Sequence, residues 1–553
     1  MKKLALLLSF FAISFAGNSQ KNNPTYSFEN LPVIATTSFK TDTFNVLRYG
    51  AKADGITLDT KAINDAIKAA HQNGGGVVFV PKGLYITGPI EIKSNVNLHL
   101  AKNAILQYTR DFSQYDLVRS NWEGLPQMRN QSPIWATNQE NIAITGHGII
   151  DGGGDAWRFV KKDKQTASQW NKLVASGGVV SEDKKVWYPT VQSYEASKAK
   201  NPGELKADRD MNYYMGIKDF LRPNLMVLTS CKRILIEGVT FQNSAAWNLH
   251  PLMSEDIIIR NIQVKNPWYA QNGDGLDLES CKNVLVEDSI FDVGDDGICI
   301  KSGRDAWGRE RAMPTENVII RNCTIYQAHG GFVIGSEMSG GAKNIFVSDC
   351  TFIGTDIGLR FKTTRGRGGV VENIHIKNIN MTGILGEAIL FDMYYAAIDP
   401  VPLTGEQREA PAVVLLPVTE ETPSFKNFTI SNVVCDGAEK ALFVRGLPEL
   451  QIQNIQFDNM FLKANKGIDL QEATGIRLKD VHLQIKDGSP LISIQNGRQI
   501  EFENLDYNSS PLLFKITGAQ SSQIKAKGVR LDQVKQTAQF GAGAQEKVLT
   551  INK

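Results

Sequence analysis

The amino-acid sequence predicts an all-β protein that winds as a parallel β-helix, with a capping helix at its N-terminal end. Two observations carry this prediction: a phrase of the form N-I-x-I returns along the chain, and apolar residues alternate with polar ones within each copy. The first apolar residue of the clearest copies stands at 234, 257, 284, 318, 345 and 374, so the steps are 23, 27, 34, 27 and 29 residues. Alternation indicates strands with one buried face, and a repeat of roughly 20 to 35 residues without helical stretches indicates stacked coils.

Weaker copies extend the repeat in both directions. They begin at Val96 and Ile142 before the clear copies, and at Phe428, Leu450, Ile476 and Ile500 after them. A β-propeller blade needs about 40 or more residues, and a β-sandwich would not keep one register over so many copies. These two all-β alternatives are therefore disfavoured.

Composition limits the function classes. At about 150 residues per domain, 553 residues suggest three or four domains, but the repeat explains the length as one continuous solenoid. Hydrophobic residues make up 42% and charged residues 21%, which excludes a disordered chain and a polytopic membrane protein. A net charge of +2 gives no overall attraction to nucleic acid or anionic lipid, so a polyanion would have to meet a local cluster of basic residues.

The N-terminal segment is typical of an exported protein. Residues 1–16 carry Lys2 and Lys3, then an apolar run too short to span a bilayer, then small residues, so we expect a signal peptide and a secreted or periplasmic location. Residues 17–43 are expected to be a linker, and residues 44–553 a single β-helix domain. We expect a monomer without a membrane span.

Two segments stand outside the repeat. Residues 60–71 place small and apolar residues at helical spacing before Asn73 and three glycines, which predicts an amphipathic helix covering the first coil. Residues 155–220 form a charged, aromatic insertion. A loop of this length in a compact solenoid is often functional, but a purely decorative surface insertion explains it equally well.

The six cysteines suggest no metal site. They show no C-x-x-C or comparable spacing. Export would permit disulfides, but we expect mostly buried thiols, because unpaired cysteines usually behave as small apolar side chains.

Polar residues recur where the repeat needs only turns. Asn272 and Asp274 lie in one copy, Asp295 and Asp296 in the next, His329 in the third, and Arg360 and Lys362 in the fourth. Residues one coil apart lie about 5 Å apart along the axis, so these side chains can form one patch. Clustered carboxylates raise each other's proton affinity, which suits acid–base hydrolysis of a glycosidic bond. Calcium binding, or a turn with solvated charges, would explain the aspartates alone.

Taken together, these motifs resemble the polygalacturonases, the pectin-degrading β-helix enzymes of glycoside hydrolase family 28. The ordered set is Asn-x-Asp, Gly-Asp-Asp, His-Gly and Arg-x-Lys, and the resemblance covers about residues 44–505. It implies a single-stranded right-handed parallel β-helix, with residues 44–553 as the catalytic domain. It also implies a pectic polysaccharide or oligogalacturonide as substrate, with no nucleic-acid partner, no cofactor and no metal.

The resemblance assigns roles to the acidic residues and the histidine. Asp295 would protonate the glycosidic oxygen, while Asp274 and Asp296 would activate water. Inversion would place acid and base about 6.5–9.5 Å apart. His329 would hold or tune the acid.

The remaining site residues would bind substrate. Arg360 and Lys362 would clamp a uronate carboxylate on the leaving-group side, which favours galacturonate there over rhamnose. Asn272 would orient the carboxylates, and Tyr394 or Tyr395 would stack beside the basic pair. Four further basic residues could add positive potential, although solvated charges are the more ordinary interpretation: Lys301, Arg304, Arg365 and Arg367.

Three functions therefore stay open at this point. The first is a polygalacturonase, with exo-action favoured because residues 155–220 and a loop around 396–424 could close one end of the cleft. The second is a calcium-dependent pectate lyase with Arg360 or Lys362 as base. The third is a non-catalytic β-helix that binds polysaccharide.

Overall fold

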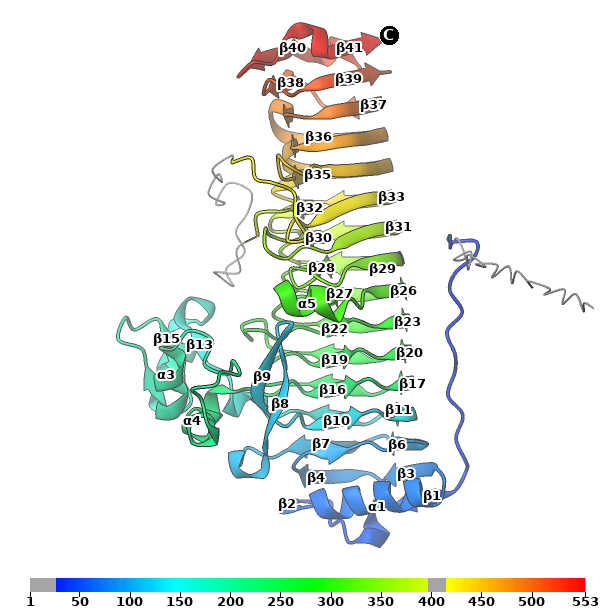
Figure 1. The fold of residues 1–553 in the computed structure, drawn as a ribbon, viewed down its shortest axis with the longest axis vertical. Helices are drawn as coiled ribbons and strands as arrows, with labels where there is room; N and C mark the ends of the chain where they lie inside the picture. Colours follow the sequence, from blue (N-terminus) through cyan, green and yellow to red (C-terminus); the bar gives the residue numbers. More distant parts are fainter. Residues whose placement is uncertain (1–25, 396–413, 553) are drawn as a thin grey trace, which may run out of the picture.

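A computed structural model describes residues 26–395 and 414–552, and the predicted signal peptide at 1–16 lies outside these residues. The chain winds as a right-handed parallel β-helix whose coils stack along one long axis, with the N-terminal coils at the bottom of Figure 1 and the C-terminus at the top. The predicted fold class is confirmed.

Each complete coil contributes a strand to each of three parallel faces. The face that carries the site, called here the site face, stacks β5 (Ile90–Glu91), β10 (Ile134–Thr137), β16 (Met226–Thr229), β19 (Leu249–Leu252), β22 (Leu276–Glu279), β25 (Ile298–Lys301), β28 (Phe332–Ile334), β30 (Leu359–Lys362), β32 (Glu387–Asp392), β34 (Lys440–Arg445), the last parts of β35 (Ile452–Gln471) and β36 (Ala473–Gln495), β38 (Ser510–Thr517) and β40 (Val534–Gly541).

The second face follows each site strand. It stacks β1 (Thr43–Asn45), β3 (Gly76–Val80), β6 (Val96–Leu100), β11 (Glu140–Gly146), β17 (Lys232–Glu237), β20 (Glu255–Arg260), β23 (Lys282–Glu287), β26 (Thr315–Arg321), β29 (Ala342–Ile353), β31 (Val370–Thr382), β33 (Ser424–Asp436), β35, β36, β37 (Arg498–Tyr507), β39 (Ser522–Lys527) and β41 (Leu549–Asn552). The third face stacks β2 (Asp54–Leu58), β4 (Gly83–Thr87), β7 (Ala104–Tyr108), β12 (Ile149–Asp151), β18 (Thr240–Gln242), β21 (Gln263–Lys265), β24 (Ile290–Asp292) and β27 (Thr324–Tyr326), and continues in the later halves of the long strands from β29 onward.

The repeat read from the sequence is the register of the second face. Ile234 pairs with Ile257, which pairs with Val284, and the series continues through the other clear copies. Phe428 pairs with Ile455 and not with Leu450, so the predicted copy at 450 was five residues too early. A bend precedes β35 and contains Leu450, so the strand begins only at Ile452.

Asparagine opens many of these strands for a structural reason. Asn283, Asn317 and Asn344 all adopt a left-handed backbone with φ between 55° and 59°, which asparagine tolerates better than most residues. The Nδ2 of Asn317 donates to Asn283, and that of Asn344 donates to Asn317, at 3.1 and 3.2 Å. The amides therefore form a ladder that holds the bends of successive coils in line.

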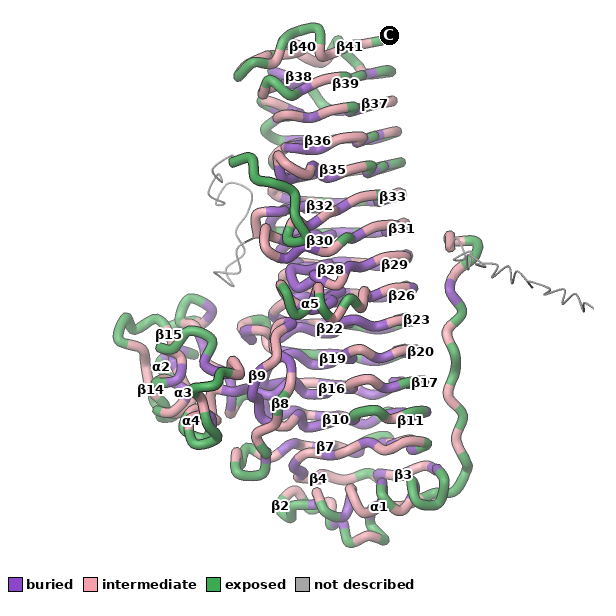
Figure 2. Tube along the Cα trace, in the orientation of Figure 1, coloured by how far each residue is buried: buried purple, intermediate pink, exposed green. Residues whose placement is uncertain are grey.

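The apolar core fills the interior of the solenoid, as Figure 2 shows by the buried segments along the coils. Helix α1 (Thr60–Gln72) covers the first coil and buries Ala62, Ile63, Ala66, Ile67 and Ala70, so the predicted cap is confirmed. Residues 26–42 of the predicted linker run along the side of the coils: Phe28 meets the ring of Phe346, and Asn141 bonds the backbone of Ser38. No helix in the described ranges has the length and apolar character to cross a bilayer.

Three segments project from the coils around the site face (Figure 1). A hairpin of β8 (Leu117–Trp122) and β9 (Leu125–Asn130) lies against the site strands. The insertion at 155–220 forms a separate lobe with β13 (Val160–Lys161), α2 (Ala167–Ala175), β14 (Val179–Val180), β15 (Val186–Tyr188), α3 (Val191–Ser197) and α4 (Met211–Gly216). Helix α5 (Asp305–Arg311) follows β25.

All six cysteines are buried and free, as expected. Burial raises the pKa of Cys231 to about 11 and that of Cys281 to about 12, so these thiols stay protonated and unreactive.

Candidate active site

Strand register brings the predicted site residues together. Leu276 pairs with Ile298, which places Asp274 beside Asp296 on the next coil. Ile298 pairs with Phe332, which places Asp295 beside His329. The residues named from four separate copies therefore meet at the edge where the chain enters the site face.

Three of the aspartates form one tight cluster. A carboxylate oxygen from each of Asp274, Asp295 and Asp296 lies within 4.8 Å of those of the other two. This is closer than the 6.5–9.5 Å expected for an acid and base on opposite sides of a bound sugar, so that expectation was wrong. The cause is the fold: the carboxylates lie in the turns that precede two adjacent parallel strands, β22 and β25, and neighbouring strands are only about 4.8 Å apart.

Two cations neutralise Asp296. The Nζ of Lys362 lies 2.7 Å from its Oδ2, and Nη1 of Arg360 lies 3.2 Å from its Oδ1. Burial would raise the pKa of Asp296, but Lys362 and Arg360 outweigh it and hold this pKa below its usual value. Asp296 is therefore ionised at neutral pH.

His329 bridges two carboxylates. Its Nδ1 lies 3.2 Å from Asp295 Oδ1, and its Nε2 lies 3.6 Å from Asp356 Oδ2. Burial opposes ionisation of Asp295, but His329, Lys362 and Arg360 lower its pKa well below the usual value. Burial keeps the pKa of Asp356 raised despite His329. The predicted contact between His329 and Asp295 is present.

Asp274 is the carboxylate that holds a proton most strongly. Burial first, and then the charges of Asp295 and Asp277, raise its pKa well above the usual value, and its Oδ1 has no hydrogen-bond partner among the described residues. The charges of this structure thus place a proton on Asp274 and leave Asp295 ionised, although the resemblance names Asp295 as the acid. A proton has to reach Asp295 before it can protonate a leaving group.

One of the two predicted tyrosines lies beside the basic pair of Arg360 and Lys362. Arg360 and Lys362 lie 5.7 and 4.9 Å from the ring centre of Tyr395. Tyr394 instead packs against Arg365 and Arg445 on the far side of the pair, at 5.2 and 5.3 Å. Tyr395 therefore lies beside the pair, as predicted, whereas Tyr394 does not.

Asn272 orients Asp295 through its backbone. Its N–H donates to Asp295 Oδ2 at 3.2 Å, while its side-chain oxygen accepts from Arg222 Nη2 at 2.8 Å. Its amide nitrogen donates to Glu123 at 3.5 Å. The amide side chain is thus held by Arg222 and Glu123 rather than by a carboxylate of the cluster.

The four additional basic residues are paired rather than solvated. Lys301 lies 3.0 Å from Glu337 and 3.5 Å from Asp277, deep under the cluster. Arg365 bonds Glu449 through two nitrogens, and Arg367 bonds Asp305. Arg304 lies 3.5 Å from Glu123. Their charges are largely balanced by carboxylates, so they add less free positive potential than four isolated cations would.

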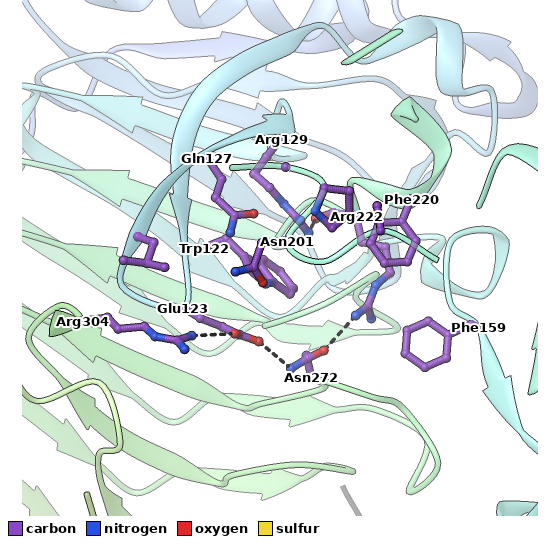
Figure 3. Close-up of a pocket in the computed structure, with 14 residues that line it drawn as sticks. Trp122, Glu123, Gln127, Arg129, Phe159, Asn201, Phe220, Arg222, Asn272 and Arg304 are labelled. Carbon is purple, nitrogen blue, oxygen red and sulfur yellow. Dashed lines mark hydrogen bonds and ion pairs between the residues drawn. The ribbon is translucent and has the colours of Figure 1, made fainter. Parts of the chain in front are cut away.

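A cavity of ≈ 280 Å³ opens beside Asn272 on the N-terminal side of the cluster (Figure 3). The hairpin supplies Trp122, Glu123 and Arg129 to its lining, and residues 199–203 of the insertion supply another wall. Backbone bonds hold the lobe on the hairpin: Met128 N–H donates to Gly203 O at 2.8 Å, and Asn130 N–H to Leu221 O at 3.2 Å. The insertion therefore forms one wall at this end of the site.

The sequence profile of Glycosyl hydrolases family 28 matches residues 217–409, which include every residue of the predicted site. Residues 217–409 are therefore similar to this family. A second profile, described as Rhamnogalacturonase A/epimerase, pectate lyase-like, matches residues 43–182, where the first coils and part of the insertion lie.

Curated relatives and a solved structure show similarity of the same kind. A probable polygalacturonase of Vitis vinifera is 30% identical over 61% of this chain, and the chain spans 60% of that relative's length. An exo-poly-alpha-D-galacturonosidase of Dickeya chrysanthemi is 28% identical, over 78% of this chain and 69% of the relative. The crystal structure of an exopolygalacturonase from Thermotoga maritima is 29% identical with a TM-score of 0.63, over 86% of this chain and 94% of the other.

Several charged residues near the site were not predicted from the sequence. Asp356 could have been found, because it precedes β30 by the offset at which His329 precedes β28. Glu123 and Arg129 lie on a hairpin outside the repeat, so no periodicity marks them. Lys164 comes from the insertion, where it is 8% exposed and has its ammonium 5.8 Å from the ring of Trp268.

Proposed function

We propose that the chain hydrolyses the α-linked galacturonate of pectin with inversion at the anomeric carbon, and that it acts from a chain end. The main evidence is the cluster of three carboxylates, which Lys362 and Arg360 contact at Asp296. It offers a proton donor, a base and a binding site for a uronate within one patch. The relatives named as exo-acting galacturonosidases support the same reaction.

The substrate itself completes the protonation of the acid. Lys362 and Arg360 are among the causes that lower the pKa of Asp295. A uronate carboxylate bound by this pair offsets their charge, so the pKa of Asp295 rises and the proton held by the cluster moves toward it. Asp295 then protonates the glycosidic oxygen while Asp296 or Asp274 accepts a proton from the attacking water.

The short carboxylate separation by itself lies near the 5–5.5 Å or so of enzymes that retain the anomeric configuration. Such an enzyme needs a free carboxylate nucleophile. Asp296 is bound by two cations, which withdraw its charge, and Asp274 holds a proton. Both are better suited to handling the proton of a water molecule than to forming a covalent bond with the sugar.

Exo-action follows from the closed N-terminal end of the site. The hairpin and the insertion meet there through backbone hydrogen bonds, and the cavity between them has the volume of a small ligand site. A polymer cannot continue through such an end, so one terminal unit is released at a time. The predicted second wall at 396–424 lies outside the described residues up to 413. Residues 414–421 contact Arg365 and Gly366 beyond the basic pair.

The lyase alternative fits the basic pair poorly. Burial favours a neutral Lys362, but Asp296 and Tyr395 outweigh it and raise the pKa of Lys362 above its usual value. The pKa of Arg360 is also raised, chiefly by Asp296, despite burial. Neither side chain readily gives up its proton to become a base. Two of the three aspartates that calcium would need are already engaged: Asp295 with His329, and Asp296 with these cations.

We also propose that the protein is exported, since residues 1–16 have the pattern of a signal peptide. A second proposal is that it is a monomer. Cell fractionation with N-terminal sequencing of the mature protein tests the first statement, and size-exclusion chromatography with light scattering tests the second. A mature chain that begins at Met1 in the cytoplasm would contradict export.

Product analysis on polygalacturonate tests the function. The parent should release monomeric galacturonate from the start, with a slow fall in viscosity, and Asp295→Asn should release almost none. An early ladder of oligomers would contradict exo-action. Products that absorb ultraviolet light and vanish with a chelator would indicate the lyase, and no release of galacturonate from any pectic substrate would overturn the proposal.

A further inference from the structure

The cavity on the N-terminal side of the cluster contains more cations than anions. Its lining has three arginines, Arg129, Arg222 and Arg304, and one carboxylate, Glu123 (Figure 3). A site for a neutral sugar has no need of this excess, whereas a uronate carries the matching charge.

Two of the three arginines already have several polar partners. Arg304 faces Glu123 at 3.5 Å. Arg222 donates to the carbonyls of Ala245 and Gln271 and to the side chain of Asn272, at 2.8–3.0 Å. These bonds fix Arg222 as part of the wall.

Arg129 has fewer polar contacts than either, because it lacks both the ion pair of Arg304 and the three hydrogen bonds of Arg222. It is 6% exposed, and no carboxylate among the described residues forms an ion pair with it. Only its Nη2 donates, to the backbone oxygen of Arg222, and its Nε is buried without a partner. Its guanidinium lies 3.6 Å from the ring centre of Trp122, which holds the planar group in one orientation.

Burial and the nearby Arg222 depress the pKa of Arg129, although Glu123 opposes this. A cation in such surroundings gains from a bound anion more than an exposed one would, because little water competes for it. The cavity size of ≈ 280 Å³ lies just below the usual range for drug-sized ligands, about 300–1,000 Å³, and suits one sugar ring rather than a chain.

We propose that Arg129, held flat against Trp122, binds the free carboxylate of the terminal, non-reducing galacturonate and thereby makes the enzyme reject a methyl ester at that unit. The inference rests on the proposed function. The cavity also includes Asn272, whose N–H holds Asp295, so the sugar in the cavity is the one whose glycosidic bond Asp295 reaches. Methylation would remove the charge and leave the guanidinium buried without an anion.

Two digalacturonates test this: the free acid, and the same disaccharide methyl-esterified only on its non-reducing unit. The parent should show a kcat/KM at least about 30-fold higher for the free acid, the range expected when one partner of a desolvated charge pair is removed. Arg129→Gln should lose a similar factor on the free acid and almost nothing on the ester. Arg129→Lys should restore part of the preference, since it keeps the charge.

A matched control is Arg119→Gln, which removes an exposed arginine from the same hairpin and should leave the preference unchanged. Equal rates of the parent on both disaccharides would overturn the inference, as would equal losses on both in Arg129→Gln. If the parent hydrolyses polygalacturonate yet treats the disaccharides alike, only the inference fails. If it hydrolyses none of these substrates, the proposed function fails.

Discussion

The coils that bear the site and the C-terminal coils share one register, but they differ in how far their outward-pointing charged side chains are buried. In the site coils, Asp277 and Glu279 are fully buried and Lys301 is 4% exposed, although all three point away from the apolar core. In the C-terminal coils, Lys515 of β38 on the same face is exposed. Lys463 and Asp436 form a ladder pair on the third face, with half or more of each side chain exposed. The difference comes from what covers the face: the hairpin, the insertion and α5 pack over the site coils (Figure 2).

A histidine–aspartate pair occurs in both regions and makes the comparison direct. His329 and Asp295 lie 3.2 Å apart and are 12% and 17% exposed, whereas His482 and Asp506 lie 2.7 Å apart and are each 45% exposed. The geometry of the pair is shared, but only the first pair has two further carboxylates and two cations around it. The scaffold repeats the contact, and charged residues of the neighbouring coils turn only the first copy into a candidate active site.

The largest expected difference is in catalysis. Asp295→Asn should lower kcat on polygalacturonate by about 10²–10⁴-fold, the usual contribution of a general acid, because the amide cannot protonate the leaving oxygen. Asp506→Asn should keep parental activity. Circular dichroism and thermal melting should match the parent for both, and a C-terminal variant that lost as much activity would break the comparison.

The second largest difference should be in how much an ion pair contributes to stability in the two regions. Lys362→Met leaves Asp296 buried beside Asp274 and Asp295 with one cation fewer, so we expect a loss of about 3–5 kcal/mol in unfolding free energy. Lys463→Met removes an exposed pair and should cost at most about 1 kcal/mol. Denaturant melts measure both, and equal losses would mean that covering the face does not strengthen its ion pairs.

The asparagine ladder should behave alike in the two regions, because it belongs to the scaffold. Asn344 and Asn454 both have a left-handed backbone and both donate to the asparagine one coil earlier. Each change to alanine should cost about 1–2 kcal/mol, from the strain of a left-handed residue, and leave kcat unchanged. Thermal melts and activity assays of the two variants check this, and a large activity loss in Asn344→Ala would separate the regions after all.

The smallest effect concerns Asp277, whose two oxygens have no hydrogen-bond partner among the described residues. Burial raises its pKa, so the folded chain keeps a proton that the unfolded chain releases above the usual pKa, and stability falls as pH rises through that interval. Asp277→Asn removes this dependence. It should stabilise the protein by up to about 1 kcal/mol at pH 7, because loss of the 3.5 Å contact with Lys301 offsets part of the gain, and by much less near pH 4, as thermal melts at both values would show.

The strand pairing of the coils could be predicted from the sequence because the coils are periodic. The pairing of Ile234 with Ile257, and the meeting of Asp295 with His329, follow from counting along the repeat. Leu450 was misplaced where a turn changed the count. The cluster residues were predictable as one patch from the coil spacing, but the short separation of acid and base was not, because the resemblance implied a longer one.

The residues outside the repeat could not be placed by counting. Glu123 and Arg129 reach the site on a hairpin, and Lys164 on the insertion, and only the folded chain shows which coil each one meets. Charge states were also out of reach. The proton preference of Asp274 over Asp295 depends on burial and on distances to Lys362 and His329, which no motif encodes.

The central claim is single-step hydrolysis by three carboxylates of adjacent coils. Proton NMR of polygalacturonate in the first minutes of reaction tests it most directly, with Asp295→Asn as the inactive control. Inversion predicts that the released galacturonate appears first as the β-anomer and only later equilibrates. Initial release of the α-anomer would show retention through a covalent intermediate, and signals of an unsaturated uronate would show elimination; either result would contradict the account.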